Sequence, residues 1–99
     1  PLNVIKSNLQ LMVDQAKANN ITPILAAMRI PPNYGKRYTS GFYDIFKQTA
    51  EKNSITLIPF ILEDVALNPE LMQSDGIHPT ELAQPLLLDR AWETLEPLL

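Results

Sequence analysis

Apolar side chains recur along the chain in two patterns, which predict helices alternating with short strands. One set has helical spacing and predicts an amphipathic helix over residues 2–19: Leu2, Ile5, Leu9, Met12 and Ala16. Asn19 and Asn20 fit the end of this helix, because Asn tolerates the left-handed conformation. Residues 21–28 (ITPILAAM) form an apolar run without alternation, as in a strand buried on both faces.

The middle of the chain repeats this order. Residues 29–37 (RIPPNYGKR) predict a loop, since prolines, an Asn and a Gly break any periodicity. A second helix is set up by Tyr38, Phe42, Ile45 and Thr49. It is expected to end near Asn53. Residues 55–62 (ITLIPFIL) predict a second buried strand, in which Pro59 favours an edge position or a bulge near the strand's end.

The last third predicts irregular chain followed by a helix. Residues 63–74 lack periodicity and allow only single helical turns, and residues 75–79 predict a tight turn. Thr80 is a good N-cap for a final helix, and Pro85 falls early in that helix, where a missing N–H costs least. The predicted order is α-β-α-β-α, with one right-handed, parallel βαβ unit.

This set of elements is small for an α/β domain. Parallel strands occur almost only in larger sheets covered on both faces, and a chain of 99 residues buries a modest share of its surface. The sequence also begins with Pro1 and not with Met, which suggests that the start of the gene product is absent. We therefore expect residues 1–99 to be a single partial domain, whose missing strands lie upstream or come from a partner chain.

Composition and charge narrow the function classes. With 45% hydrophobic and 19% charged residues the chain is an ordinary globular sequence, which excludes a disordered tail. Seven basic and three acidic side chains lie in residues 1–60, against one and eight in residues 61–99, a pattern of solvated surface. The net charge of −3 disfavours nucleic acid as a partner. No apolar run is long enough for a membrane span, and no signal peptide is visible.

The chemistry in the sequence centres on its one histidine. His78 follows Asp75 by three residues in a turn that leads into a helix. A carboxylate that accepts the imidazole Nδ1–H fixes the tautomer and leaves Nε2 free to take a proton from a nucleophile. Gly76 would let the backbone bend so that the two side chains converge. The alternative is an ordinary turn, in which Asp75 bonds backbone amides and His78 is merely exposed.

Metal and cofactor chemistry has little support. One His, no Cys and scattered carboxylates give no recognisable metal-ligand spacing, so no cofactor is expected.

Several segments resemble a known family in the same order along the chain. The Asp75-Gly-Ile-His78-Pro79 segment resembles the last motif block of the SGNH (GDSL) hydrolases. Residues 28–38 (MRIPPNYGKRY) look like a loop of its bacterial thioesterase I, lysophospholipase L1 or arylesterase subfamily. Further similarity lies in Pro59-Phe60, Leu71-Met72-Gln73 and Ala83-Gln84-Pro85.

The resemblance implies a three-layer α/β/α sandwich around a parallel sheet of about five strands, of the flavodoxin-like kind. It also implies hydrolysis of acyl esters or thioesters through an acyl-enzyme intermediate. In that scheme Asp75 orients His78, and His78 is general base and then general acid. Ile30 and Pro31 would lie nearest the acyl chain; otherwise they belong to a rigid surface loop whose path Pro31 and Pro32 fix. A periplasmic or secreted location is likewise implied.

The chain departs from the family at its nucleophile. The family's Gly-Asp-Ser block is absent, and none of the serines has that context: Ser7, Ser40, Ser54 and Ser74. The Gly and the Gly-x-Asn-Asp block that complete the family's oxyanion hole are also absent. The chain therefore looks like a C-terminal half that needs an N-terminal half, and alone it is expected to be inactive.

Two other functions remain open from the sequence. One is a catalytically inactive truncated chain that associates through a bare sheet edge. The other is a nucleic-acid-binding module, which would use the basic loop residues Arg29, Lys36 and Arg37 together with Tyr38. The net charge opposes this second alternative.

Overall fold

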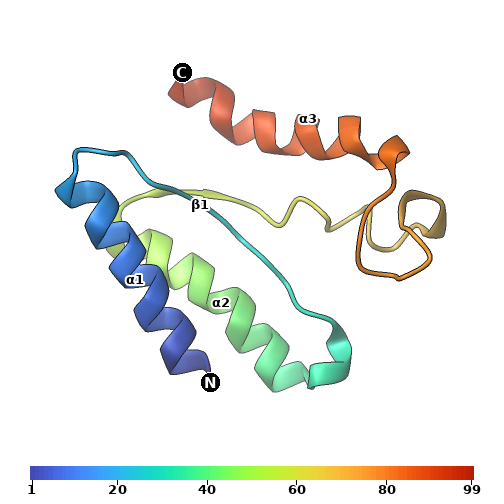
Figure 1. Cartoon of the computed structure of the whole chain (residues 1–99), viewed down its shortest axis with the longest axis horizontal. Helices are drawn as coiled ribbons and strands as arrows, with labels where there is room; N and C mark the ends of the chain where they lie inside the picture. The colour runs from blue at the N-terminus through green and yellow to red at the C-terminus, as the bar shows by residue number, and fades with distance from the viewer. The chain divides into compact units, whose positions relative to one another are not determined.

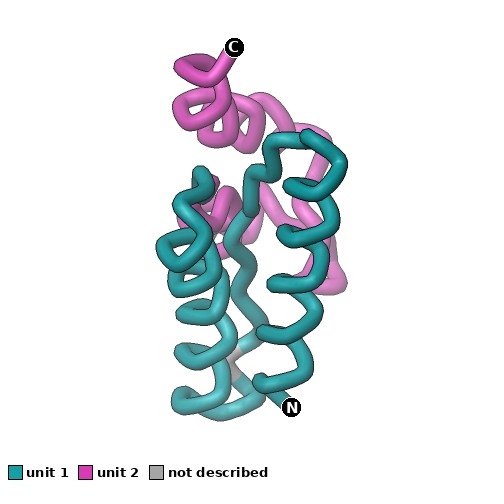
Figure 2. Tube along the Cα trace, turned by 90° about the vertical axis from the view of Figure 1, so that its left-hand side faces the viewer, with its two compact units in different colours: residues 1–57 teal, residues 58–99 magenta. Residues whose placement is uncertain are grey.

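The computed structural model describes the chain from residue 1 to residue 99 apart from the placement of Pro32, so the role of Pro32 in the loop path lies outside the described residues. It divides into two compact units, residues 1–57 and residues 58–99 (Figure 2).

The first unit holds two long helices and a short parallel strand pair (Figure 1). α1 (Leu2–Ala18) leads into β1 (Ile24–Ala26), and α2 (Lys36–Asn53) leads into β2 (Thr56–Ile58). A single 3-10 turn, η1 (Pro32–Tyr34), precedes α2. β1 and β2 pair in parallel, and β2 ends one residue inside the second unit. The predicted α-β-α-β order and the parallel pairing are confirmed.

The helices α1 and α2 lie side by side and are joined by a reciprocal amide pair. Gln10 Nε2 donates to Asn53 Oδ1 and Asn53 Nδ2 donates to Gln10 Oε1, both at 2.8 Å. Lys17 Nζ also donates to the backbone carbonyl of Asn53 at 2.6 Å. These bonds fix the end of α2 against α1. The buried side chains of this unit are Val13, Ala27, Ile45, Phe46, Thr49 and Ala50.

Both strands are shorter than the apolar runs that predicted them. β2 stops immediately before Pro59, which has no N–H to donate to a ladder, so Pro59 lies just outside the strand and not within it at an edge position or a bulge. The prediction that β1 is buried on both faces is wrong for this chain, since Ile24 is 38% exposed. The elements of this unit leave the first and last residues of β1 exposed.

The second unit is mostly irregular chain that ends in α3 (Gln84–Leu95). Single 3-10 turns occur at η2 (Pro69–Leu71), η3 (Glu81–Ala83) and η4 (Glu96–Leu98). The α-helix begins at Gln84 and not just after Thr80, which corrects the predicted start. Pro85 is the physical reason: it lacks the N–H that an α-helix starting at Thr80 would need, so a 3-10 turn precedes α3.

The second unit buries few side chains, and α3 buries none of its own. The buried residues are Ile58, Phe60, Val65 and Ala83. Leu86 and Trp92 of α3 are 46% and 43% exposed. Among the described residues, no helix is long and apolar enough to cross a membrane.

Candidate active site

The loop that carries Asp75 and His78 is the tip of a small antiparallel hairpin. Met72 and Pro79 form an isolated antiparallel bridge at its base. Within it, the Gln73 N–H donates to the His78 carbonyl at 2.8 Å. The hairpin therefore brings the chain entering the loop next to the chain leaving it.

The turn inside the hairpin depends on Gly76. Its N–H donates to the Gln73 carbonyl at 3.0 Å, which closes a four-residue turn. Gly76 has φ +70°, a left-handed conformation that costs glycine little and other residues more. The expectation that Gly76 lets the backbone bend is confirmed. Because the chain reverses here, His78 comes back beside Asp75.

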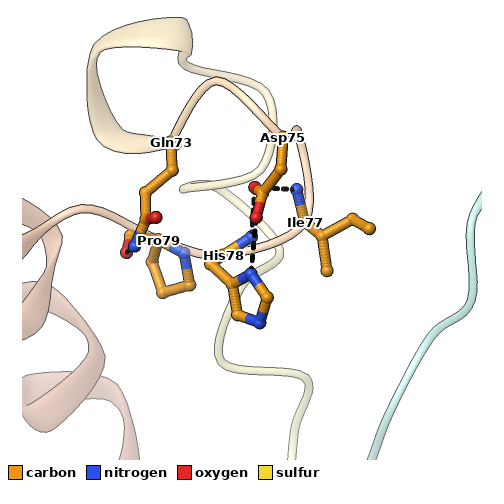
Figure 3. A network of polar contacts seen from close by, with 5 residues as sticks. All are labelled: Gln73, Asp75, Ile77, His78 and Pro79. Atoms are coloured by element: carbon orange, nitrogen blue, oxygen red, sulfur yellow. Dashed lines mark hydrogen bonds and ion pairs between the residues drawn. The ribbon is translucent and has the colours of Figure 1, made fainter.

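Both oxygens of the Asp75 carboxylate contact residues of the loop that starts at Asp75 (Figure 3). Oδ1 accepts the backbone N–H groups of Ile77 and His78 at 2.9 and 3.0 Å. Oδ2 lies 2.6 Å from Nδ1 of the His78 ring. Sequence reasoning had left a choice between a turn-forming and a ring-orienting carboxylate, and one side chain does both.

These bonds stabilise the charged form of Asp75. The hydrogen bond with the His78 ring, followed by the backbone N–H groups of His78 and Ile77, holds the pKa of the Asp75 carboxyl well below its ordinary range. A carboxylate that stays ionised is the form that accepts the Nδ1–H bond. The imidazole is thereby directed to the tautomer that carries its proton on Nδ1.

The second ring nitrogen is available for chemistry. Among the residues that the structure describes, none hydrogen-bonds to His78 Nε2, and the His78 side chain is 68% exposed. A neutral imidazole with Nδ1–H bound to a carboxylate presents Nε2 as a proton acceptor. The pair can therefore act as a general base toward a hydroxyl or a water molecule.

The other two predicted site residues lie in the first unit, on the loop after β1. Ile30 is half-buried and Pro31 is exposed, and the Pro31 carbonyl accepts the Tyr34 N–H at 3.3 Å. The Arg29 guanidinium stacks on the Tyr43 ring of α2, 3.7 Å from its centroid. This contact ties the start of the loop to α2. Contact of Ile30 and Pro31 with an acyl chain stays a prediction.

Sequence reasoning missed one residue of this hairpin. Besides its backbone bonds, the Gln73 side chain donates from Nε2 to the Pro79 carbonyl at 3.1 Å (Figure 3). The available signal was the turn itself, which implies that residues a few positions before Gly76 face the residues just after His78.

The geometry of the described residues offers no candidate metal site. Within the part of the chain that the structure describes, no three side chains of the His, Cys, Asp or Glu type gather as a metal site would require.

Comparison with known proteins gives a consistent set of relatives. The chain is 44% identical over 89 residues to an arylesterase of Vibrio mimicus, covering 90% of the chain and 44% of the relative. It is 40% identical over 93 residues to thioesterase 1/protease 1/lysophospholipase L1 of Escherichia coli K12, covering 94% and 45%. No family model matches the sequence.

Solved structures agree in fold as well as in sequence. The psychrotrophic esterase EstA of Pseudoalteromonas is 35% identical with a TM-score of 0.92, over 99% of this chain and 54% of that one. AlinE4, an SGNH-hydrolase family esterase, is 32% identical with a TM-score of 0.69, over 100% and 52%. Over its whole length the chain is similar to part of an SGNH-hydrolase family esterase. Its α/β class is thereby confirmed.

The chain spans about half the length of the SGNH hydrolases that it matches, and the similarity lies in their C-terminal part. The esterase and thioesterase names belong to these longer relatives.

Proposed function

We propose that this chain supplies the Asp and His of a Ser-His-Asp triad in an enzyme that hydrolyses carboxylic esters or thioesters. The 2.6 Å contact between Asp75 Oδ2 and His78 Nδ1 carries the proposal. It occurs in a chain that is similar to SGNH-hydrolase family esterases, and it leaves the exposed His78 side chain without a hydrogen-bond partner at Nε2 among the described residues. Asp75 is the orienting residue and His78 is the proton carrier.

The proton path follows from this geometry. His78 Nε2 takes the proton of a serine hydroxyl as that oxygen attacks the acyl carbonyl, and the ionised Asp75 stabilises the resulting imidazolium. The imidazolium then gives the proton to the leaving alcohol or thiol, which departs and leaves an acyl-enzyme. In the second half, His78 takes a proton from water, hydroxide adds to the acyl carbon, and the serine leaves with that proton.

The nucleophile comes from outside these 99 residues in this proposal. The sequence has no Gly-Asp-Ser block and none of the family's oxyanion motifs, and it spans about half of its relatives. We propose that residues 1–99 are one partial domain that an N-terminal half completes, and that the chain is inactive alone. The exposed apolar side chains of α3 suit burial by that half.

The substrate is assigned only by class. The relatives are named for aryl esters, thioesters and lysophospholipids, and all of these present an acyl carbonyl to a nucleophile. Ile30 and Pro31 are proposed to border the acyl chain, and Arg29 to hold their loop through its stack on Tyr43. A periplasmic or secreted location is proposed on the family resemblance alone, and fractionation of the expressing cells tests it.

The test is hydrolysis by the complete enzyme with matched variants. Wild type, His78→Ala and Asn19→Ala are compared on a short-chain p-nitrophenyl ester and on an acyl thioester. Asn19 is the control because, among the described residues, its side chain bonds only to the Gln15 carbonyl at the end of α1. We expect His78→Ala to lose several orders of magnitude in kcat and Asn19→Ala to lose nothing. Normal turnover by His78→Ala would refute the triad assignment.

A further inference from the structure

Hydrogen bonds, and not packing, hold the loop that carries the Asp75 and His78 pair. Residues 73–78 are all exposed, so no apolar burial fixes them. Their order depends on a few bonds between the two sides of the hairpin. A residue whose bonds join the two sides of this hairpin therefore helps to set where His78 lies.

Gln73 makes three such bonds. Its N–H donates to the His78 carbonyl at 2.8 Å, and its carbonyl accepts the Gly76 N–H at 3.0 Å. Its side-chain Nε2 donates to the Pro79 carbonyl at 3.1 Å. The carbonyls of His78 and of the following residue are thus both held by one glutamine.

The side-chain bond adds a link directly after His78. Pro79 has no N–H, so its backbone can join the hairpin's hydrogen bonds only through its carbonyl. The Gln73 side chain donates to that carbonyl and so holds the chain that leaves His78. The backbone N–H of His78 is held at the same time by Asp75 Oδ1. His78 is then held through its backbone N–H, its own carbonyl and the next carbonyl, while the contact of Nδ1 with Asp75 Oδ2 orients the imidazole.

We propose that Gln73 is a positioning residue for His78, acting through the Pro79 carbonyl. This inference rests on the proposed function, because it assigns Gln73 a part in the same site. Gln73 does not meet the reacting atoms. Its loss lowers the fraction of molecules in which His78 Nε2 is aimed at the nucleophile, so kcat falls while substrate binding is kept.

The test compares Gln73→Met with Gln84→Met in the complete enzyme. Methionine has nearly the shape of glutamine but cannot donate. Gln84 is the matched control, since its Nε2 makes the same kind of bond to the Thr80 carbonyl, at 3.2 Å and outside the loop. We expect Gln73→Met to lower kcat about tenfold with KM unchanged, the scale of one lost hydrogen bond. Gln84→Met should keep both constants.

A second measurement does not depend on turnover. NMR of the His78 imidazole should show the Nδ1–H proton as a sharp signal in wild type and Gln84→Met, and as a broadened signal in Gln73→Met. Gln73→Asn, which keeps the amide but shortens its reach, should behave like Gln73→Met and replaces it if that variant does not fold.

The outcomes separate the two proposals. An unchanged kcat and a sharp Nδ1–H signal in Gln73→Met would overturn the role of Gln73 while His78→Ala still lacks activity. An equal fall in Gln84→Met would also overturn it. Full turnover by His78→Ala would refute the triad, and the NMR comparison would still decide whether Gln73 orders His78.

Discussion

Asp75 holds His78 at two points: Oδ2 lies 2.6 Å from the imidazole Nδ1, and Oδ1 accepts the backbone N–H of the same residue at 3.0 Å. The ring cannot turn away without breaking the first contact, and the backbone cannot shift without breaking the second. One carboxylate therefore sets both the tautomer of the imidazole and its position, although the loop is exposed.

Replacing Asp75 by Asn should separate these two roles. The Asn side-chain oxygen can still accept the backbone N–H groups, but it lacks the charge that stabilises an imidazolium. We expect the loop to keep its backbone order and kcat of the complete enzyme to fall by about 10³–10⁴-fold, as for a triad with the wrong tautomer. Asp75→Ala should lose the backbone order as well. A kcat for Asp75→Asn close to wild type would show that the charge does not act in the reaction.

The pH dependence of the loop follows from the lowered pKa of Asp75. Because its folded-state pKa lies below the unfolded value of about 3.9, its stabilisation is complete above that value and is lost as pH falls through the folded-state pKa. The amide protons of Ile77 and His78 should therefore stay protected from exchange at about pH 4, at the ordinary carboxyl pKa. Asp75→Asn should remove this pH dependence, and loss of protection in wild type near that pH would contradict the assignment.

Substitution of Gly76 should strain the loop without a clash. No atom lies within 4 Å of the position that a Cβ would take, but φ is +70°. Gly76→Ala should cost about 1–2 kcal/mol in the free energy of unfolding, and Gly76→Asn less, because Asn tolerates this conformation. Chemical denaturation measures both values. Equal stability of the Ala variant and wild type would mean that the turn does not need a left-handed residue.

The amide pair between α1 and α2 should stabilise the first unit. Asn53→Ala removes the pair with Gln10 and the bond to the Thr49 carbonyl, and should lower the free energy of unfolding by about 1–3 kcal/mol. Asn19→Ala loses a single exposed bond at the end of α1 and should cost less. A double-mutant cycle with Gln10→Ala isolates the pair. Additive effects of the two substitutions would show that the pair contributes no coupling.

The helices could be predicted closely because their signals are local. α1 and α2 end where the apolar spacing and the asparagines indicated, and Asn20 has φ 59°. The strands were predicted too long, because an apolar run does not say where pairing stops. α3 starts later than the Thr80 N-cap signal predicts, because Pro85 lacks an N–H and a 3-10 turn therefore precedes the α-helix.

The candidate site was also predicted only in part from the sequence. Asp75 and His78 are three residues apart with a glycine between them, so the sequence was sufficient to predict that they converge. The role of Gln73 depends on the register of a hairpin, and the stack of Arg29 on Tyr43 joins a loop to a helix. Neither contact leaves a periodic signal in the sequence: the first depends on the register of a short hairpin, and the second on where a loop meets a helix.

The most direct measurement is ester hydrolysis by this chain alone and after mixing with a separately produced N-terminal half that carries the Gly-Asp-Ser block. A short-chain p-nitrophenyl ester is the substrate, and His78→Ala is assayed in parallel. We predict no turnover by the chain alone, turnover by the mixture, and loss of that turnover in the mixture with His78→Ala. His78-dependent turnover by the chain alone, or full turnover by the mixture with His78→Ala, would contradict the account.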